Sequence, residues 1–175
     1  MKATGIVRRI DDLGRVVIPK EIRRTMRLRE GEPLEIFTDS AGGVVFKKYS
    51  PAGEQSSTAT NLCESIYRTC ARPVVICDRD SIIASAGSSR RELEGKPLSY
   101  ELEKIMESRQ LKKSDEGVPV SPSLPTVAAS VVAPVISEGD LCGCVAFLKS
   151  DDPISELDVR LAQTSAMFFA RQMEN

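Results

Sequence analysis

The sequence predicts two domains: a small β-rich domain over residues 1–50 and an α+β domain over residues 59–175, joined by a linker at 51–58. Short β-branched runs broken by turn residues fill the first part. Helical and strand patterns follow one another in the second part. Residues 1–29 hold nine Lys and Arg against three Asp and Glu, a net charge of +6, whereas the whole chain carries −1. We therefore expect a phosphate-bearing partner for the first domain.

The N-terminal domain is predicted to consist of two hairpins around a short helix. Gly14 suits a tight turn in the first hairpin, and the Gly-rich residues 41–43 suit the turn of the second. Pro19 fits the first turn of the helix, where its missing N–H costs no hydrogen bond. The predicted strands cover residues 6–10, 16–18, 33–38 and 44–49.

A domain of about fifty residues buries only a small core, so it needs a further source of stability. Disulfides, metal sites and oligomerisation are the usual solutions. The first fifty or so residues contain neither cysteine nor histidine. The sequence therefore favours a homodimer.

The C-terminal domain is predicted to be a layered arrangement of helices and mostly antiparallel strands. The Pro, Gly and Ser content of residues 51–58 is typical of a linker. Residues 112–125 contain three prolines and are expected to form a surface loop. The predicted helices and strands cover residues 59–71, 74–77, 81–87, 98–110, 126–136 and 141–148, with a last helix that starts at Asp152-Pro153 and runs to about Met173.

A pattern of residues identifies the N-terminal domain with a known family. The segments Thr4–Arg8, Leu13–Pro19 and Ile22–Arg24, with Leu34–Ile36 and Lys47–Tyr49 further on, resemble the DNA-binding domain of AbrB-type bacterial transition-state regulators. The resemblance implies a swapped-hairpin fold, in which two chains interlock. It also implies that DNA is bound by the family's arginines, which correspond to Arg8, Arg15, Arg23 and Arg24 here.

The chemistry of these residues agrees with a DNA partner. Arginine can form paired hydrogen bonds with phosphate oxygens or with the edge of guanine, and the strong positive charge adds Lys2 and Arg9 as further candidates. Asp11 and Asp12 are interpreted as turn residues that orient the neighbouring arginines. Because the helix after Pro19 is too short to read several bases, we expect degenerate, A·T-rich double-stranded operators that are recognised partly by DNA shape.

The late C-terminal segments Ala133–Ile136 and Leu141–Leu148, with Gly139 between them, resemble the last hairpin of GAF domains. The whole combination is similar to regulators of spore formation in endospore-forming bacteria. That similarity implies activation and repression of late, forespore-specific genes. A small-molecule partner stays open, since Phe147 and Leu148 could fill a GAF pocket and the sequence shows no ligand signature.

The last helix carries two apolar stripes, so one can cover the sheet and the other can meet a partner helix. Together with the first helix of the domain, this surface would join two N-terminal dimers into a homotetramer. The stripe that contains Phe169 and Met173 is predicted to be the free one. The candidate oligomerisation residues are Leu157, Leu161, Phe168, Phe169 and Met173.

Several function classes are disfavoured. The absence of histidine removes Ser-His and Cys-His catalysis, so we expect no enzyme, no metal and no cofactor. Five cysteines without an export signal argue against disulfides. No apolar run reaches the roughly 20 residues that cross a bilayer, so a cytoplasmic, nucleoid-associated protein is expected. An antitoxin that binds a protein partner through its C-terminal part is the alternative.

Overall fold

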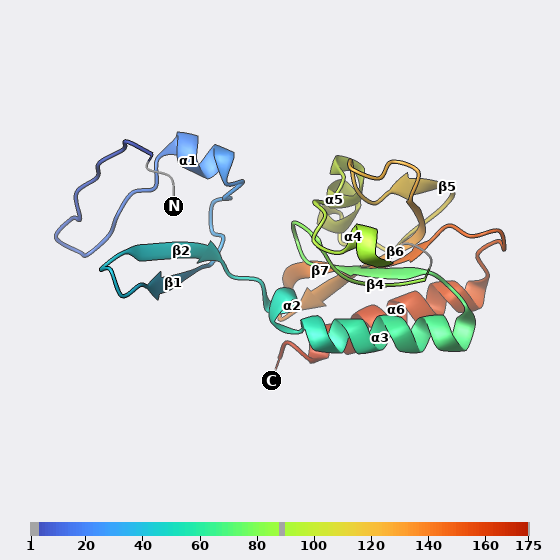
Figure 1. The fold of residues 1–175 in the computed structure, drawn as a ribbon. Helices are drawn as coiled ribbons and strands as arrows, with labels where there is room; N and C mark the ends of the chain where they lie inside the picture. Colours follow the sequence, from blue (N-terminus) through green and yellow to red (C-terminus); the bar gives the residue numbers. More distant parts are fainter. Residues whose placement is uncertain (1–3, 88–89, 175) are drawn as a thin grey trace. The chain divides into compact units, whose positions relative to one another are not determined.

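The computed structural model describes residues 4–87 and 90–174, and the chain divides into two compact units. The N-terminal unit is Met1–Tyr49 and the C-terminal unit is Ser50–Asn175 (Figure 1). Each unit is described by itself below.

The N-terminal unit contains one short helix, α1 (Lys20–Thr25), and one hairpin formed by β1 (Leu34–Thr38) and β2 (Val44–Lys48). The two strands pair antiparallel over their whole length. Asp39 shapes the turn, because its carboxylate accepts hydrogen bonds from the backbone N–H groups of Ala41 at 2.9 Å and Gly43 at 2.7 Å. The predicted helix and second hairpin are therefore present.

The first predicted hairpin differs from the structure. The segments 6–10 and 16–18 form no strands in the described chain. A hydrogen-bonded turn at Asp11–Gly14 connects them. A β-branched segment becomes a strand only when a neighbouring strand takes up its backbone hydrogen bonds. No other segment of the described chain pairs with either one.

The expected linker over residues 51–58 is helical instead. Ser50 caps α2 (Pro51–Glu54) by accepting a hydrogen bond from the N–H of Gly53 at 3.0 Å, and α3 (Ser56–Cys70) follows directly. Ala52 is completely buried. Ser followed by Pro is typical of a linker, but it is equally a signal for the start of a helix.

The C-terminal unit is built on a five-stranded sheet with the order β4-β3-β7-β6-β5, in which all neighbours are antiparallel (Figure 1). This arrangement is the α+β design predicted from the sequence. The strands are β3 (Val74–Cys77), β4 (Ile82–Ala86), β5 (Lys112–Pro119), β6 (Ala128–Ser137) and β7 (Asp140–Leu148). The remaining helices are α4 (Arg90–Leu93), α5 (Tyr100–Glu107) and α6 (Glu156–Arg171).

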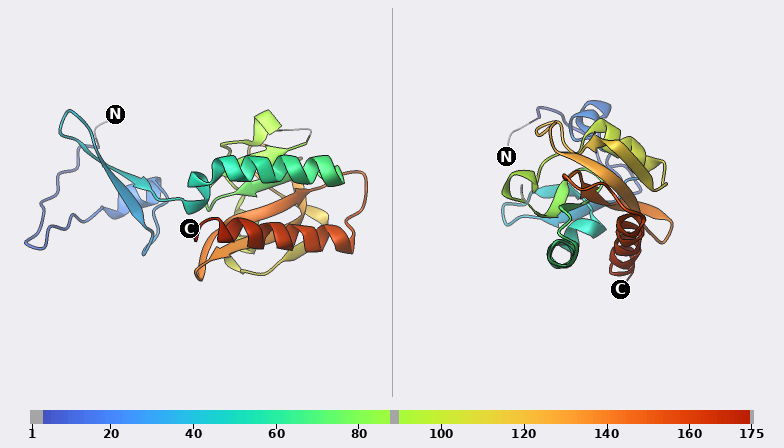
Figure 2. Two further views of the ribbon diagram at one scale, coloured as in Figure 1. Left: turned by 90° about the horizontal axis from the view of Figure 1, so that it is seen from below. Right: turned by 90° about the vertical axis from the view of Figure 1, so that its right-hand side faces the viewer.

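Helices cover both faces of this sheet. The long helices α3 and α6 lie side by side on one face, and α4 and α5 lie on the other (Figure 2). Successive side chains of a strand point to opposite faces of the sheet, so the core has two layers. Phe147 packs under α3 and α6, whereas Ala146 packs under α5. Helices therefore cover most of both faces of the sheet.

Two boundaries differ from the prediction. Residues 112–119 form the edge strand β5 rather than a loop, with an irregular ladder between Lys113 and Val118. This strand could not be recognised from its polar, Gly- and Pro-containing sequence. Its residues have a low preference for strands, and they form one because they pair with β6. Helix α6 begins after Ser155 rather than at Asp152-Pro153, because Ser155 and Asp158 form a reciprocal capping box.

One polar network ties the start of α6 to the end of α3. Arg72 pairs with Asp158 at 3.1 Å, and both side chains are about nine-tenths buried. Arg72 also donates to the carbonyl oxygens of Asp152 and Pro153, each at 2.8 Å. Burial raises the pKa of Asp158, but hydrogen bonds from Ser155 and the charge of Arg72 outweigh it and hold that pKa below its ordinary value. The network therefore stays ionised near neutral pH.

Candidate nucleic-acid interface

The arginines predicted to bind DNA are all exposed side chains of the N-terminal unit. Arg8 and Arg9 lie on the extended segment before the turn, and Arg15 lies directly after it. Arg23 and Arg24 occupy the last turn of α1. Lys2 lies outside the described residues. The structure thus places every described candidate where a phosphate could reach it.

The turn before Arg15 is organised by Asp11. One carboxylate oxygen accepts the backbone N–H groups of Leu13 at 3.0 Å and Arg15 at 2.7 Å, and the other accepts the Nε–H of Arg15 at 2.9 Å. Hydrogen bonds from the Arg15 backbone and then from its side chain lower the pKa of Asp11. Asp11 therefore remains negative and holds a side chain that is 69% exposed.

Helix α1 is short for a recognition element. It has six residues, so it is about 9 Å long at 1.5 Å per residue. Pro19 precedes it with a φ of −57°, close to the helical value. A helix of this length presents Arg23 and Arg24 at one end and offers little further surface to a groove.

The N-terminal unit has almost no core of its own. Among residues 4–49, Pro19 is the only buried residue. Large apolar side chains are exposed on both sides of the turn and on the hairpin. They include Val7 (84%), Ile10 (69%), Leu13 (70%), Val16 (44%) and Ile36 (62%). An exposed apolar surface of this extent on a small unit marks a contact surface.

Lys47 and Lys48, which follow the apolar part of β2, both have partners within the unit. The ammonium group of Lys47 lies 4.5 Å from the centre of the Phe37 ring, and that of Lys48 lies 3.6 Å from a carboxylate oxygen of Glu32. These contacts favour their role as charged residues of a strand edge.

The structure divides the predicted oligomerisation residues of α6 between the core and the surface. Leu157 is 74% exposed and Phe168 is 48% exposed, whereas Leu161 is half-buried. Phe169 is completely buried against the sheet, and Met173 packs at the edge of the same core. The stripe predicted to be free therefore covers the sheet, and the stripe of Leu157 and Phe168 faces outward.

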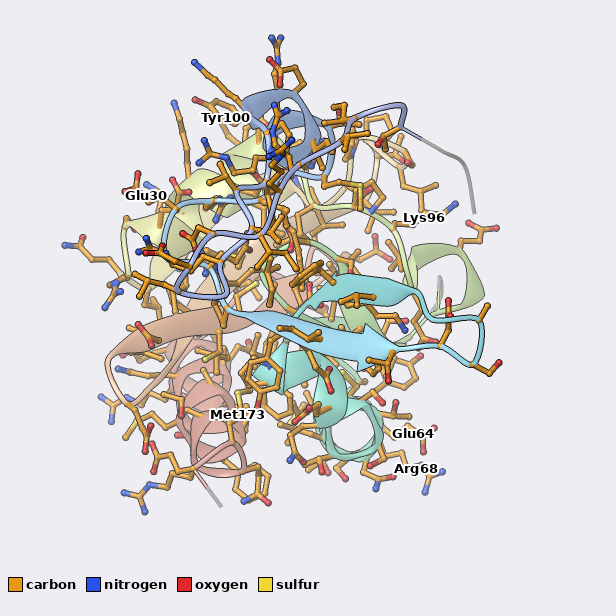
Figure 3. All side chains as sticks on the ribbon, turned by 90° about the vertical axis from the view of Figure 1, so that its left-hand side faces the viewer. Glu30, Glu64, Arg68, Lys96, Tyr100 and Met173 are labelled. Atoms are coloured by element: carbon orange, nitrogen blue, oxygen red, sulfur yellow. The ribbon has the colours of Figure 1, made fainter. Side chains whose placement is uncertain are left out.

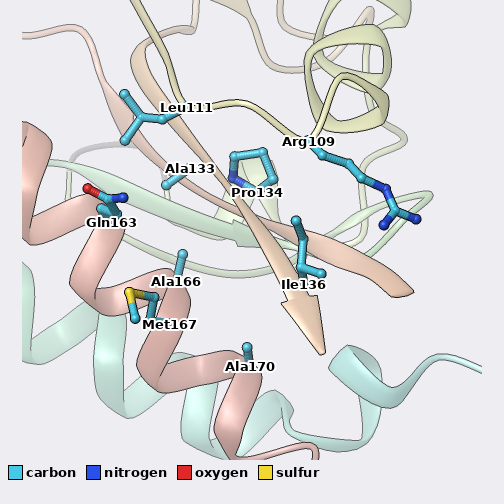
Figure 4. A pocket seen from close by; sticks show the side chains of 9 residues that line it. All are labelled: Arg109, Leu111, Ala133, Pro134, Ile136, Gln163, Ala166, Met167 and Ala170. Atoms are coloured by element: carbon cyan, nitrogen blue, oxygen red, sulfur yellow. The ribbon is translucent and has the colours of Figure 1, made fainter. Parts of the chain in front are cut away.

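A groove of about 220 Å³ lies between α6 and β6 and was not found from the sequence. Its walls combine small and apolar side chains with the polar ends of Arg109 and Gln163 (Figure 4). Arg109 donates a hydrogen bond to the carbonyl oxygen of Gly139 at 2.6 Å. The other lining residues are Leu111, Ala133, Pro134, Ile136, Ala166, Met167 and Ala170.

The cysteines of the sheet are packing residues. Cys77 and Cys144 are opposite one another on β3 and β7 and are completely buried. The hydrogen bond between the two thiols, together with burial, raises the pKa of Cys77 well above its ordinary value. Residues two apart on a regular strand share a face, but Cys142 belongs to the other core layer because the ladder between β6 and β7 is irregular opposite Cys142, between Val135 and Ile136. Cysteine side chains buried in this way behave as small apolar groups.

Within residues 4–87 and 90–174, no group of three or more acidic or Cys side chains is arranged to hold a metal ion. None of the helices in that part of the chain is long and apolar enough to cross a membrane.

Family models match both units of the chain. A model described as the stage V sporulation protein T C-terminal, transcription factor, matches residues 54–174. A model described as the antidote-toxin recognition MazE, bacterial antitoxin, matches residues 7–54.

Relatives with curated descriptions agree with these models. Stage V sporulation protein T of Bacillus subtilis is 46% identical over 177 residues, which is 99% of each chain. The transition state regulatory protein AbrB of the same organism is 55% identical over 51 residues, which is 29% of this chain and 52% of AbrB.

Solved structures cover the two units separately. The N-domain of the transcription factor AbrB shares 55% identity, with a TM-score of 0.27, over 29% of this chain and 96% of that one. The type II free methionine-R-sulfoxide reductase of Thermoplasma acidophilum shares 15% identity, with a TM-score of 0.54, over 70% of this chain and 95% of that one. At this identity the second likeness shows the fold alone.

These findings, with the basic N-terminal unit, define a transcriptional regulator with an AbrB-type DNA-binding domain. The predicted AbrB-type N-terminal domain and the predicted α+β design of the C-terminal unit are confirmed, whereas the GAF-like assignment of that unit stays a prediction. The chain belongs to the stage V sporulation protein T family.

Proposed function

We propose that this chain is a sequence-specific DNA-binding regulator that activates some late, forespore-specific sporulation genes and represses others. The observation that carries the proposal is the exposed set of arginines on a unit whose first 29 residues have a net charge of +6. Arg8, Arg15, Arg23 and Arg24 would contact DNA, and Lys2 and Arg9 would add to the positive field.

The N-terminal units would act in pairs. The unpaired segments 6–10 and 16–18 and the exposed apolar side chains near them support this proposal. A second chain can supply both the missing strand neighbours and the missing core. Each arginine would then occur twice, so four arginine positions would give about eight contacts to DNA.

The C-terminal units would join two such pairs into a tetramer. The outer surface of α6 exposes Leu157 and Phe168, and Tyr67 on the neighbouring helix α3 is 41% exposed. Glu64 and Arg68 form an ion pair at 3.7 Å, and both project from α3 (Figure 3). Apolar side chains rimmed by charged ones are the pattern of a contact between helix pairs.

The antitoxin alternative has one supporting observation, the MazE model that matches residues 7–54. In that alternative the C-terminal unit would bind a protein partner. The relative that matches 99% of the chain is a sporulation protein, which favours the regulator.

The salt dependence of DNA binding tests the proposed function. We expect the affinity of the full chain for an A·T-rich duplex to fall steeply with salt, with a log–log slope of about −7 if about eight phosphates are neutralised. A G·C-rich duplex of the same length should bind more weakly at every salt concentration. A slope near zero, or the absence of binding at low salt, would contradict the proposal.

A further inference from the structure

The turn between the two extended segments is held together by one carboxylate. The backbone of Asp11 both donates to the carbonyl oxygen of Arg15 and accepts from the N–H of Gly14, each at 3.0 Å. Its side chain accepts two backbone N–H groups of the same turn and the Nε–H of Arg15. The turn and the Arg15 side chain are thus fixed by the same group.

The ion pair leaves the far edge of Arg15 available. A guanidinium group carries five donors in one rigid plane, and Asp11 occupies the one on Nε. The two terminal amino groups form the opposite edge of this plane, which is the edge that makes paired hydrogen bonds with guanine. With its side chain 69% exposed, Arg15 is held in place while it still faces solvent.

A carboxylate next to a DNA-contacting arginine has a cost. Asp11 stays ionised, so it repels every phosphate that approaches the turn, whatever the base sequence. It therefore reduces the affinity for any DNA. Its bonds to the backbone stabilise the turn, and its bond to Nε orients Arg15. Of these two effects, only the orientation of Arg15 can distinguish one base sequence from another.

We propose that Asp11 is a positioning residue that sets the sequence specificity of DNA binding by orienting Arg15. This inference rests on the proposed function, because it requires that Arg15 contacts DNA. Asp12 provides a contrast: it carries the same charge at the neighbouring position, and no hydrogen bond between its side chain and Arg15 is formed in the structure.

The test uses the full chain and the variants Asp11→Asn and Asp12→Asn. Asparagine keeps an oxygen that can accept the backbone N–H groups of the turn, but it lacks the charge that holds the guanidinium. The two probes are the duplex that the wild type selects most strongly from a randomised pool and a scrambled duplex of the same length. The measured quantity is the ratio of the two dissociation constants.

For Asp11→Asn we expect tighter binding of the scrambled duplex and a specificity ratio that is about tenfold lower, since one good base contact contributes roughly 1–3 kcal/mol of discrimination. Asp12→Asn should also bind the scrambled duplex more tightly, but with the ratio unchanged. Equal ratios for the two variants would overturn the inference. Far-ultraviolet circular dichroism confirms that each variant keeps the fold of the wild type.

An Arg15→Ala background separates the inference from the function on which it rests. There, Asp11→Asn should no longer change the ratio, because the side chain that Asp11 orients is gone. If Arg15→Ala lowers affinity while Asp11→Asn leaves the ratio unchanged, the inference fails and the DNA-binding role of Arg15 stands. If Arg15→Ala binds both duplexes as the wild type does, both the inference and that role fail.

Discussion

Replacing Gly143 by alanine should destabilise the C-terminal unit by about 3 kcal/mol or more, which is a large part of the stability of an ordinary domain. Gly143 lies on β7 beside the end of β3. A Cβ atom at this position would meet the carbonyl oxygen of Cys77, with the carbonyl carbon 2.9 Å away and the Cα of Asp78 at 3.1 Å. Because these are backbone atoms in the middle of a sheet, no side-chain rotation can relieve the clash.

Gly139→Ala is the matched control for this substitution. Gly139 has a φ of +88° in the turn between β6 and β7, and no atom lies within 4 Å of an added Cβ. Backbone strain alone should cost about 1 kcal/mol there. Thermal unfolding followed by circular dichroism compares the two variants. If Gly143→Ala lost no more stability than Gly139→Ala, the close packing of β3 against β7 would be refuted.

Separate substitutions in the two units should break the tetramer in two different ways. Val16 and Ile18 alternate with Arg15 and Val17 along an extended segment, so they should lie on the face opposite Arg15. In the proposed pair that face is buried. Val16→Asp should cost about 3 kcal/mol per chain and weaken pairing of the N-terminal units about 10⁴-fold.

Phe168→Glu acts on the other contact, since Phe168 is half-exposed on α6 and is outside the core of its own unit. The masses measured by light scattering should be tetrameric for the wild type and dimeric for both variants. Only Val16→Asp should also lose DNA binding, because it separates the arginines while Phe168→Glu leaves each pair intact. A monomeric or dimeric wild type would contradict the proposed assembly.

Val17→Asp controls for the added charge near Arg15. Val17 is 71% exposed and shares the face of Arg15. The new aspartate should therefore weaken DNA binding, because it repels the phosphates, while the assembly stays tetrameric. If the assembly of Val17→Asp were dimeric, as expected for Val16→Asp, the two faces assigned to this segment would be wrong.

Much of the C-terminal fold could be predicted because its local signals agree with its packing. The short apolar runs of β3, β6 and β7, bounded by turn residues, are typical of strands that are buried on both faces, and the apolar stripes of the helices follow the helical period. Edge strand β5 could not be predicted this way, since its polar residues are ordered by the neighbouring strand. The helix start at Ser155 was missed because Asp152-Pro153 carries a similar signal three residues earlier.

The site could be predicted only in part. Charge pattern and family resemblance identified Arg8, Arg15, Arg23 and Arg24, and the structure shows these side chains exposed. The individual hydrogen bonds between Asp11 and Arg15 depend on the geometry of the turn, which a sequence pattern does not fix. On α6, two neighbouring apolar stripes compete for the sheet, and only packing shows that Phe169 covers it while Phe168 faces outward.

The most direct measurement of the central claim is the affinity of the full chain for an A·T-rich duplex, compared with that of the Arg23→Ala, Arg24→Ala double variant at the same salt concentration. Both side chains are exposed at the end of α1, so their removal should leave the fold and the mass unchanged. Loss of four contacts per pair of chains should weaken binding at least 100-fold, or about 3 kcal/mol. Binding equal to that of the wild type would contradict the assignment of DNA binding to this surface and would direct attention to the C-terminal unit.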